Sequence, residues 1–297
     1  MRINTNTAAM NTYTKYSAAA NAKASALEKL SSGSRINSAA DDAAGLAISN
    51  KMTAQISGMK QARANAQDGI SLIQTAEGAL EETQKMLNRM RDLSLQASNG
   101  TLRAEDRQEI ALEMNTLISN IDAINKNTKF NGLNLFSNTA DTTETFTFQV
   151  GANSGEIASV GIGNMSPTGL KLTTLSSQVA SLASVKDFSK ETTAAASFGA
   201  EFARKDALDA LDNAIKAVSD QRAKLGAAQN GLNHTVNSLE ATTTNLAAAN
   251  SRIKDVDMAQ EMTSYTSSNI LLQAATSMLS QANSMPQSVM TLLQNIG

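Results

Sequence analysis

The chain has 297 residues, of which 41% are hydrophobic but only 3% aromatic, with no tryptophan, no cysteine and two prolines. Its formal net charge of −2 excludes the basic surface that binding to nucleic acid or to an anionic membrane requires. The lack of cysteine excludes disulfides and thiolate metal sites, and so few prolines leave room for long helices. No secretory signal is expected in residues 1–23, because they lack an apolar core of about 7–15 residues.

The N-terminal segment is expected to form a helix that is poor in charge. Only three charged side chains occur in residues 1–27, and one helical face carries Ile3, Met10, Tyr13, Ala20, Ala24, Leu27 and Leu30. Gly33 predicts the end of this helix, and Ser38 or Asp41 is expected to cap the next one. The adjacent acids Asp41 and Asp42 favour helix-start electrostatics over catalysis, because helical neighbours do not face each other and no histidine accompanies them.

Two helices are expected to follow, over about residues 42–99 and 104–128. Apolar residues recur in both at steps of three and four: Met52, Ile56, Met59, Ala66, Ile70, Ile73, Leu80 and Leu87 in the first, and Ile110, Met114, Leu117, Ile121 and Ile124 in the second. The pair Asn131–Gly132 predicts a tight turn after the second helix.

The period then changes to two, which predicts a small β-hairpin. In residues 146–150, Phe and Val alternate with Thr and Gln as in a half-buried strand, and residues 157–162 return the chain. Residues 166–199 are rich in Ser, Thr and Ala with weak periodicity. We interpret them as a surface connection with a short helix near residues 175–185.

A long coiled-coil-like helix is predicted for residues 201–254, where one lattice of three- and four-residue steps continues for more than six heptads. Its apolar members are Leu208, Leu211, Ile215, Val218, Leu225, Leu232, Val236, Leu239, Leu246 and Ile253. Polar residues, among them Arg222, occupy the remaining lattice positions, as is typical of buried polar groups that fix the register of helices.

The C-terminal segment, residues 262–297, carries no charged side chain and no histidine. Apolar side chains recur there at steps of four and three: Leu271, Ala275, Met278, Ala282, Met285, Val289, Leu292 and Ile296. Ser, Thr, Gln and Asn interrupt them too often for a membrane span of roughly 20 apolar residues. A charge-free helix of this length, roughly 50 Å at about 1.5 Å per residue, is expected to be surrounded by protein, and copies of the same chain can provide it.

Two sequence features could indicate ligand sites, a nucleotide site and a metal site, but the residues around each do not support that interpretation. Residues 161–169, GIGNMSPTG, match a phosphate-binding glycine loop only in part, because Ser166 stands where a final glycine belongs. His234 is the only histidine and has no cysteine beside it to bind a metal, so a structural role is favoured. No cofactor, metal or enzymatic activity is expected.

Several motifs closely resemble those of bacterial flagellins. They are SRINSAADDAAGLAIS at residues 34–49, QDGISLIQTAEGAL at 67–80, FNGLNL at 130–135, FQVGAN at 148–153, SDQRAKLGAAQNGLNHT at 219–235 and SRIKDVDMAQE at 251–261. The resemblance implies a mainly α fold, in which long coiled-coil-like helices from both chain ends pair antiparallel beside a small β-hairpin region.

The resemblance also implies a division of the chain into five segments. Residues 1–40 and 255–297 are expected to form the two halves of an inner coiled-coil domain. Residues 41–165 and 201–254 are expected to form the two halves of a core domain. Residues 166–200 are too few for the outer domains that many members of the family insert, so a short connection is expected there.

The residues and the resemblance together predict a structural subunit that polymerises into the helical bacterial flagellar filament used for swimming. Burying an apolar side chain contributes about 1.5–3 kcal/mol, and ordering a residue costs about 1–2 kcal/mol. Within one chain the gain from burial and the cost of ordering nearly cancel, so the terminal helices are expected to become ordered only when neighbouring subunits cover their remaining apolar surface. Self-assembly is assigned to Ile3, Met10, Leu27, Leu271, Met278, Met285, Val289 and Leu292, and the core-helix seam to Leu208, Ile215, Leu225, Leu232 and Leu239.

Further partners are implied by the resemblance alone. Arg89, Leu93 and Glu113 match the positions that the vertebrate flagellin-recognising Toll-like receptor contacts. The family is exported through the flagellar channel without a cleaved signal peptide, and filament cap and hook-junction proteins are implied partners outside the cell. An export chaperone is expected to bind Leu271, Leu272, Met278, Leu279, Val289 and Leu292.

Three alternatives are less well supported. The main one is a hook–filament junction protein of the same export system, but such proteins match poorly at FQVGAN and SRIKDVDMAQE. A metalloprotease insert is disfavoured because no HExxH motif occurs. A pilin-like or needle-like polymer is disfavoured because the N-terminus lacks an apolar spine and the chain is too long for a needle subunit.

Overall fold

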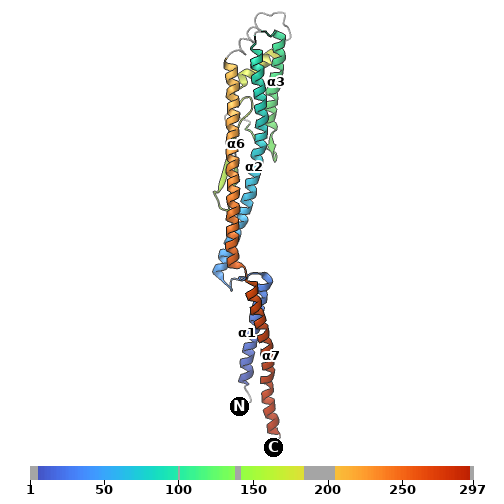
Figure 1. Ribbon diagram of the computed structural model, residues 1–297, viewed down its shortest axis with the longest axis vertical. Coiled ribbons are helices and arrows are strands. Elements are labelled where there is room, and N and C mark those ends of the chain that lie inside the picture. Colours follow the sequence, from blue (N-terminus) through green and yellow to red (C-terminus); the bar gives the residue numbers. More distant parts are fainter. Residues whose placement is uncertain (1–5, 100, 138–141, 184–204, 295–297) are drawn as a thin grey trace. The chain divides into compact units, whose positions relative to one another are not determined.

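The computed structural model describes residues 6–99, 101–137, 142–183 and 205–294 (Figure 1). The helices are α1 (Thr7–Ser32), α2 (Ala43–Ala97), α3 (Ala104–Asn127), α4 (Thr173–Ala183), α6 (Lys205–Lys254) and α7 (Met258–Gln294). The strands are β1 (Lys129–Phe130), β2 (Leu133–Asn134), β3 (Thr143–Gln149) and β4 (Ile157–Gly163). The expected mainly α fold is confirmed. The chain divides into two compact units, one formed by residues 1–57 and 242–297 and the other by residues 58–241.

In the unit of residues 58–241, one face of α2 is buried along its length. The buried positions follow alternating steps of four and three: Ala62, Ala66, Gly69, Ile73, Ala76, Leu80, Thr83, Leu87, Met90, Ser94 and Ala97. Ala66, Ile73, Leu80 and Leu87 of the expected apolar pattern lie on this face. Because the step averages 3.5 residues, the same side of the helix points into the core throughout.

The buried face of α6 combines large side chains with small ones. Every seventh residue of the expected lattice is buried: Leu211, Val218, Leu225 and Leu232. Ala207, Ala214 and Gln221 are also buried, each four residues before one of them. Of the residues assigned to the core-helix seam, Leu225 and Leu232 are buried, while Leu208, Ile215 and Leu239 are half-buried. The buried face is therefore turned by about one residue from the stripe of largest side chains.

The expected hairpin is present as the antiparallel pair β3–β4, in which Phe146 lies opposite Val160 and Phe148 opposite Ala158. Both phenylalanines are half-buried and pack against the core of this unit. The ring of Phe148 lies so close to Gly69 of α2 that a Cβ there would come within 3.2 Å of it. A glycine at this position therefore lets the hairpin approach the helix.

Residues 166–199, expected to be a surface connection, contribute in their first part to the core instead. The buried side chains of this part include Leu170, Leu172, Leu175 and Val179, and α4 packs against α3. Leu170 and Leu172 precede α4, and Ser, Thr and Gln separate the apolar residues within this helix of only 11 residues, so their periodicity is weak. Residues 184–199 lie outside the described residues.

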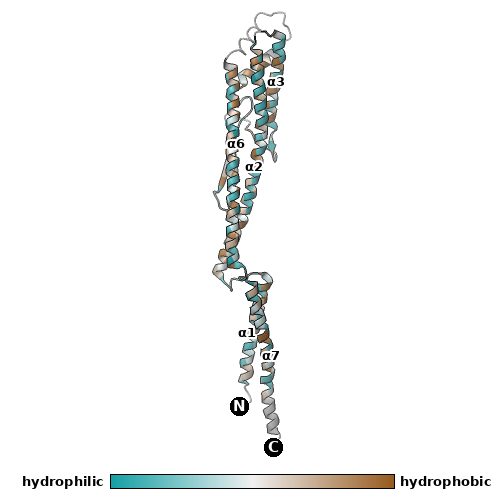
Figure 2. Cartoon of the chain, in the orientation of Figure 1, coloured by the Kyte–Doolittle hydropathy of each residue, from teal (hydrophilic) through white to brown (hydrophobic). Residues whose placement is uncertain are grey.

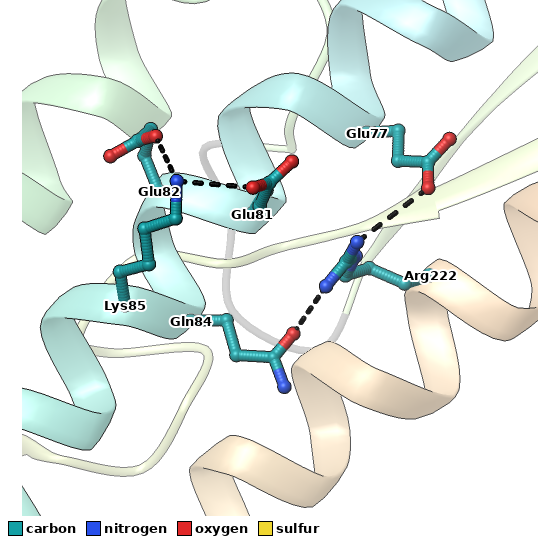
Figure 3. A network of polar contacts seen from close by, with 6 residues as sticks. All are labelled: Glu77, Glu81, Glu82, Gln84, Lys85 and Arg222. Carbon is teal, nitrogen blue, oxygen red and sulfur yellow. Dashed lines mark hydrogen bonds and ion pairs between the residues drawn. The ribbon is translucent and has the colours of Figure 1, made fainter.

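A polar contact joins α2 to α6 (Figure 3). The side chain of Arg222 donates a 2.6 Å hydrogen bond from Nη1 to Oε1 of Gln84, and its Nη2 lies 3.7 Å from Oε1 of Glu77. Gln84 in turn donates to the hydroxyl of Ser219 at 3.3 Å. Sliding one helix along the other would break these bonds between partly buried groups, so the contact favours a single register.

A second cluster in Figure 3 lies within α2 alone. The ammonium of Lys85 lies 2.8 Å from Glu82 and 3.0 Å from Glu81. The hydrogen bond to Glu82 is the main cause that raises the pKa of Lys85, and Lys85 lowers the pKa of Glu81. All three side chains are exposed and belong to one helix, so this cluster does not align α2 with α6.

In the unit of residues 1–57 and 242–297, the segment before α2 is fixed by two carboxylates. The side chain of Asp42 accepts a hydrogen bond from the backbone N–H of Gly45 at 2.9 Å and caps α2. The expectation that Ser38 or Asp41 caps this helix is therefore wrong by one residue. Asp41 instead accepts from the backbone N–H of Ser38 at 2.9 Å, and this bond is the main reason that its pKa lies below the ordinary value.

The connections at the ends of the helices pair with each other in this unit. Gly33 ends α1 with a left-handed backbone, φ 67°, as expected for a C-terminal glycine. Its carbonyl accepts from the N–H of Val256 at 3.1 Å, and the N–H of Arg35 donates to the carbonyl of Lys254 at 2.7 Å. These backbone bonds hold the α1–α2 and α6–α7 connections side by side.

Leu225 provides a test of the core of residues 58–241. Truncation of this fully buried leucine to alanine should lower the free energy of unfolding by roughly 2–5 kcal/mol, because burial is lost and a cavity remains. The exposed neighbour Lys224, changed to alanine, should alter it by less than about 0.5 kcal/mol. Urea unfolding of the full chain, followed by far-ultraviolet circular dichroism, compares the two. Equal shifts would contradict this description of the core.

Candidate functional site: the terminal helix pair

Helices α1 and α7 pack against each other (Figure 1). The side-chain amide of Asn6 donates to the carbonyl of Ala282 at 2.8 Å, and Lys23 donates to the side-chain oxygen of Asn269 at 2.9 Å. The residue number rises along α1 while that of its partner falls along α7. The two helices are therefore antiparallel, and the expected pairing of the chain ends is confirmed.

The positions that the two helices bury on pairing carry mainly small or polar side chains. On α1 the buried and half-buried residues include Ala9, Thr12, Tyr16, Ala19, Lys23, Ala26 and Leu30, and on α7 they include Glu261, Tyr265, Ser268, Leu272, Ala275, Leu279 and Ala282. Each set alternates steps of three and four, as in a coiled coil. Figure 2 shows the pale colours that this composition gives to much of both helices.

Larger apolar side chains lie beside these lines and stay exposed. Tyr13 follows the half-buried Thr12 on α1, whereas Leu271 precedes the half-buried Leu272 on α7. We call these exposed residues the outer stripes. The members with exposed fractions of 51–64% are Met10, Tyr13, Leu27, Leu271, Met278 and Met285. The helix pair therefore does not cover its own apolar surface.

Two grooves on the pair meet at Leu271. One, of about 940 Å³, runs between α1 and α7 and includes Ala18, Ala275 and Met278 in its lining. The other, of about 520 Å³, follows α7 and includes Met262 and Ile270. Leu271 lines both grooves. Apolar side chains of a second protein would find both space and apolar walls here.

The residues assigned to self-assembly and chaperone binding fall into three groups. Five of the ten belong to the outer stripes: Met10, Leu27, Leu271, Met278 and Met285. Leu272 and Leu279 are instead half-buried on the line that faces α1. Ile3 lies outside the described residues, as do the side chains of Val289 and Leu292, although the backbone of α7 runs through both positions. The sequence pattern missed three further exposed apolar side chains of α7, which lie off its lattice: Met258, Met262 and Ile270.

The three residues matched to the Toll-like receptor contact come together on α2 and α3. The guanidinium of Arg89 donates to both carboxylate oxygens of Glu113, at 2.7 and 3.1 Å, and this bond raises the pKa of Arg89. Leu93 is only 2% exposed and lines the same groove, of about 440 Å³, as Arg89 and Glu113. The groove thus has a charged rim above an apolar side chain.

The structure also places the residues considered for catalysis or metal binding. Within it, no group of three or more His, Cys, Asp and Glu side chains is placed to hold a metal ion. None of its helices combines the length and the hydropathy needed to cross a membrane. Asp41 and Asp42 bind backbone N–H groups, and His234 is exposed on α6.

Comparisons with known proteins agree with the motifs. The model of the bacterial flagellin N-terminal helical region matches residues 3–141, and that of the C-terminal helical region matches residues 208–293. The chain is 49% identical to the flagellin of Bacillus subtilis (strain 168), over 99% of this chain and all of that protein. It is 46% identical to the flagellin of Halalkalibacterium halodurans, again over 99% of this chain and all of that protein.

A solved structure described as a flagellar hook-associated protein from Vibrio parahaemolyticus gives a TM-score of 0.57, covering 72% of this chain and all of that one. Its sequence identity is 16%, so this likeness concerns the fold alone. The full-length identity to flagellins does not favour a hook–filament junction protein. The chain belongs to the bacterial flagellin family and is a structural subunit of the flagellar filament.

Proposed function

We propose that copies of this chain polymerise through the outer stripes of α1 and α7. The observation that carries this proposal is the exposure of Leu271 and Met278 on α7, which carries no charged side chain from Met262 onward. Covering such a surface removes no charged group from water. Burial of each large side chain contributes about 1.5–3 kcal/mol, so a few of them offset the cost of ordering the helix ends.

An open helical filament is the polymer expected when the α1 and α7 stripes of different subunits contact each other. The stripes on α1 and α7 differ in their residues and do not pair with each other within one chain. A contact between different surfaces of identical subunits repeats from one subunit to the next, and it builds an open helical filament when the rotation does not close. This geometry suits the extracellular filament of a flagellum.

Leu271 and Leu133 form a matched pair for testing the assembly surface. They are 58% and 60% exposed, so aspartate at either position should leave the free subunit folded. Leu271→Asp should slow seeded filament elongation by at least about a hundredfold, because an unpaired carboxylate would be buried at the contact. Leu133→Asp, in β2, should elongate at the parent rate. Electron microscopy and light scattering measure elongation, and circular dichroism checks folding.

The opposite results would contradict the proposal. Normal filaments from folded Leu271→Asp subunits would place the assembly contact elsewhere. Equal inhibition by Leu133→Asp would show that any added charge disturbs growth, whichever unit carries it.

We further propose that an export chaperone binds α7 before export. The subunit would then leave the cell through the flagellar channel, a route that uses no cleaved signal peptide. An uncharged amphipathic helix is a ligand for an apolar groove. Leu272 and Leu279 lie on the α1-facing line, so a chaperone that contacts them must displace α1. Filament cap and hook-junction proteins are proposed as partners at the ends of the filament.

Calorimetric titration of the chaperone from the same bacterium tests the binding site. Leu279→Asp should weaken binding by at least about tenfold, which corresponds to 1.4 kcal/mol. Leu133→Asp serves as the control and should bind as the parent does. Unchanged affinity of Leu279→Asp would exclude this part of α7 as the binding site.

A second proposal concerns recognition by the vertebrate flagellin-sensing Toll-like receptor at the groove of Arg89, Leu93 and Glu113. The closely placed Arg89 and Glu113 present both signs of charge beside an apolar side chain, as interface residues often do. In the isolated subunit Leu93 is accessible only at the groove floor, so the charged rim is expected to make most of the contact.

Arg89 and Arg91 allow a controlled test of this groove. Both are exposed arginines of α2 with a carboxylate partner at 2.7 Å, Glu113 for one and Asp212 for the other. Arg89→Asp should raise the concentration for half-maximal signalling in reporter cells by about tenfold or more. Arg91→Asp should leave it nearly unchanged. Equal responses of both variants would contradict recognition at this groove.

A further inference from the structure

The methionines of the described part of the chain are unevenly exposed. Those with at least half of their surface exposed all lie on α1 or α7: Met10, Met258, Met262, Met278 and Met285. In the unit of residues 58–241, Met90 and Met114 are fully buried and Met165 nearly so. Among the described methionines, the most accessible thioethers therefore lie on the terminal helices, either in the outer stripes or, for Met258 and Met262, elsewhere on α7.

Two of these methionines are placed where oxidation would matter most. Met262 lines the groove along α7, and Met278 lines the groove between α1 and α7. Both grooves include Leu271, so the two thioethers flank the leucine at which the grooves meet. Along α7, at about 1.5 Å per residue, Met262 lies roughly 13 Å and Met278 roughly 10 Å from Leu271, so a partner segment that follows both grooves across Leu271 would contact both thioethers.

We infer that Met262 and Met278 form an oxidation-sensitive modification site that controls whether a free subunit can join a filament. The inference rests on the proposed assembly function of the outer stripes. Peroxide would convert both thioethers to sulfoxides in the free subunit. Burial against a neighbouring subunit would protect them once the subunit is in the filament.

The reaction is balanced with hydrogen peroxide as the oxidant. A lone pair of the thioether sulfur attacks one peroxide oxygen, the O–O bond breaks, and a sulfur–oxygen bond forms. The sulfur loses two electrons, and the second oxygen leaves as water after taking up the proton. The product is a polar, chiral sulfoxide in place of a flexible apolar side chain.

The change in polarity explains why assembly would respond. A methionine adapts to irregular apolar neighbours because it is unbranched and polarisable. The sulfoxide oxygen is a hydrogen-bond acceptor, and burying it without a donor is unfavourable. The described α7 surface around Leu271 is lined largely by apolar groups, so an oxidised subunit should add slowly to the filament end.

The first experiment treats full-length free subunits with hydrogen peroxide and maps sulfoxides by peptide mass spectrometry. Met262 and Met278 should oxidise well before Met90 and Met114. Seeded elongation should slow by about tenfold or more, and methionine sulfoxide reductase should restore it. In peroxide-treated filaments the same two residues should oxidise at least about tenfold more slowly than in free subunits. Full oxidation with an unchanged elongation rate, or equal oxidation in filaments, would overturn the inference.

The double variant Met262→Leu/Met278→Leu separates these two residues from the other exposed methionines. Each protein is compared with itself before and after peroxide, so any change in the starting rate cancels. Leucine has a similar volume and no sulfur, so the variant should keep its own rate after treatment. A loss as large as that of the parent would assign the effect to other methionines and overturn the inference.

The untreated Leu271→Asp subunit distinguishes this inference from the proposal on which it rests. If Leu271→Asp elongates normally, the assembly surface itself is wrongly placed. If Leu271→Asp is blocked while oxidised parent subunits elongate normally, the assembly surface stands and only the oxidation site is wrong.

Discussion

The packing of α1 against α7 through small and polar side chains is the constraint on which the rest of the terminal unit depends. Ala9, Ala19 and Ala26 on one helix, with Ala275 and Ala282 on the other, occupy the line between them. Small residues hold two helices together while burying little apolar area. The larger side chains therefore remain on either side of the contact, available to other molecules.

The unit of residues 58–241 has the same alternation of small and large residues, but there other elements of the same unit cover the large residues. The buried alanines Ala207 and Ala214 alternate along α6 with the buried Leu211 and Val218, as small residues alternate with larger ones between α1 and α7. Here, however, α3, α4 and the β3–β4 hairpin supply further side chains that cover the core. The unit of residues 58–241 thus covers its own core, whereas the α1–α7 pair of the other unit leaves its outer stripes exposed.

Much of this arrangement could be predicted from the sequence because it depends on period and turn chemistry. The helices, the hairpin, the end of α1 at Gly33 and the pairing of the termini follow from such patterns. The facing line could be predicted only in part: the pattern of the C-terminal segment includes Ala275 and Ala282, which face α1, but it follows the exposed Leu271 and Met278 and omits Ser268, Leu272 and Leu279. Leu172 and Leu175 were missed for a related reason, since a short Ser- and Thr-rich segment shows little periodicity.

The lack of charge on the C-terminal helix makes the helix easier to bury, and it leaves oxidisable apolar side chains exposed until burial takes place. Burying the outer face of a helix such as α3 would remove its charged side chains from water, which costs free energy. Burying a helix without charged side chains carries no such cost. Leucine and methionine on that helix then supply the apolar contacts, and the flexible thioether of Met278 fits neighbours of irregular shape. Methionine thioethers such as that of Met278 are also the apolar groups of the outer stripes that a mild oxidant can make polar. A surface designed for burial is therefore chemically vulnerable only for as long as it remains unburied.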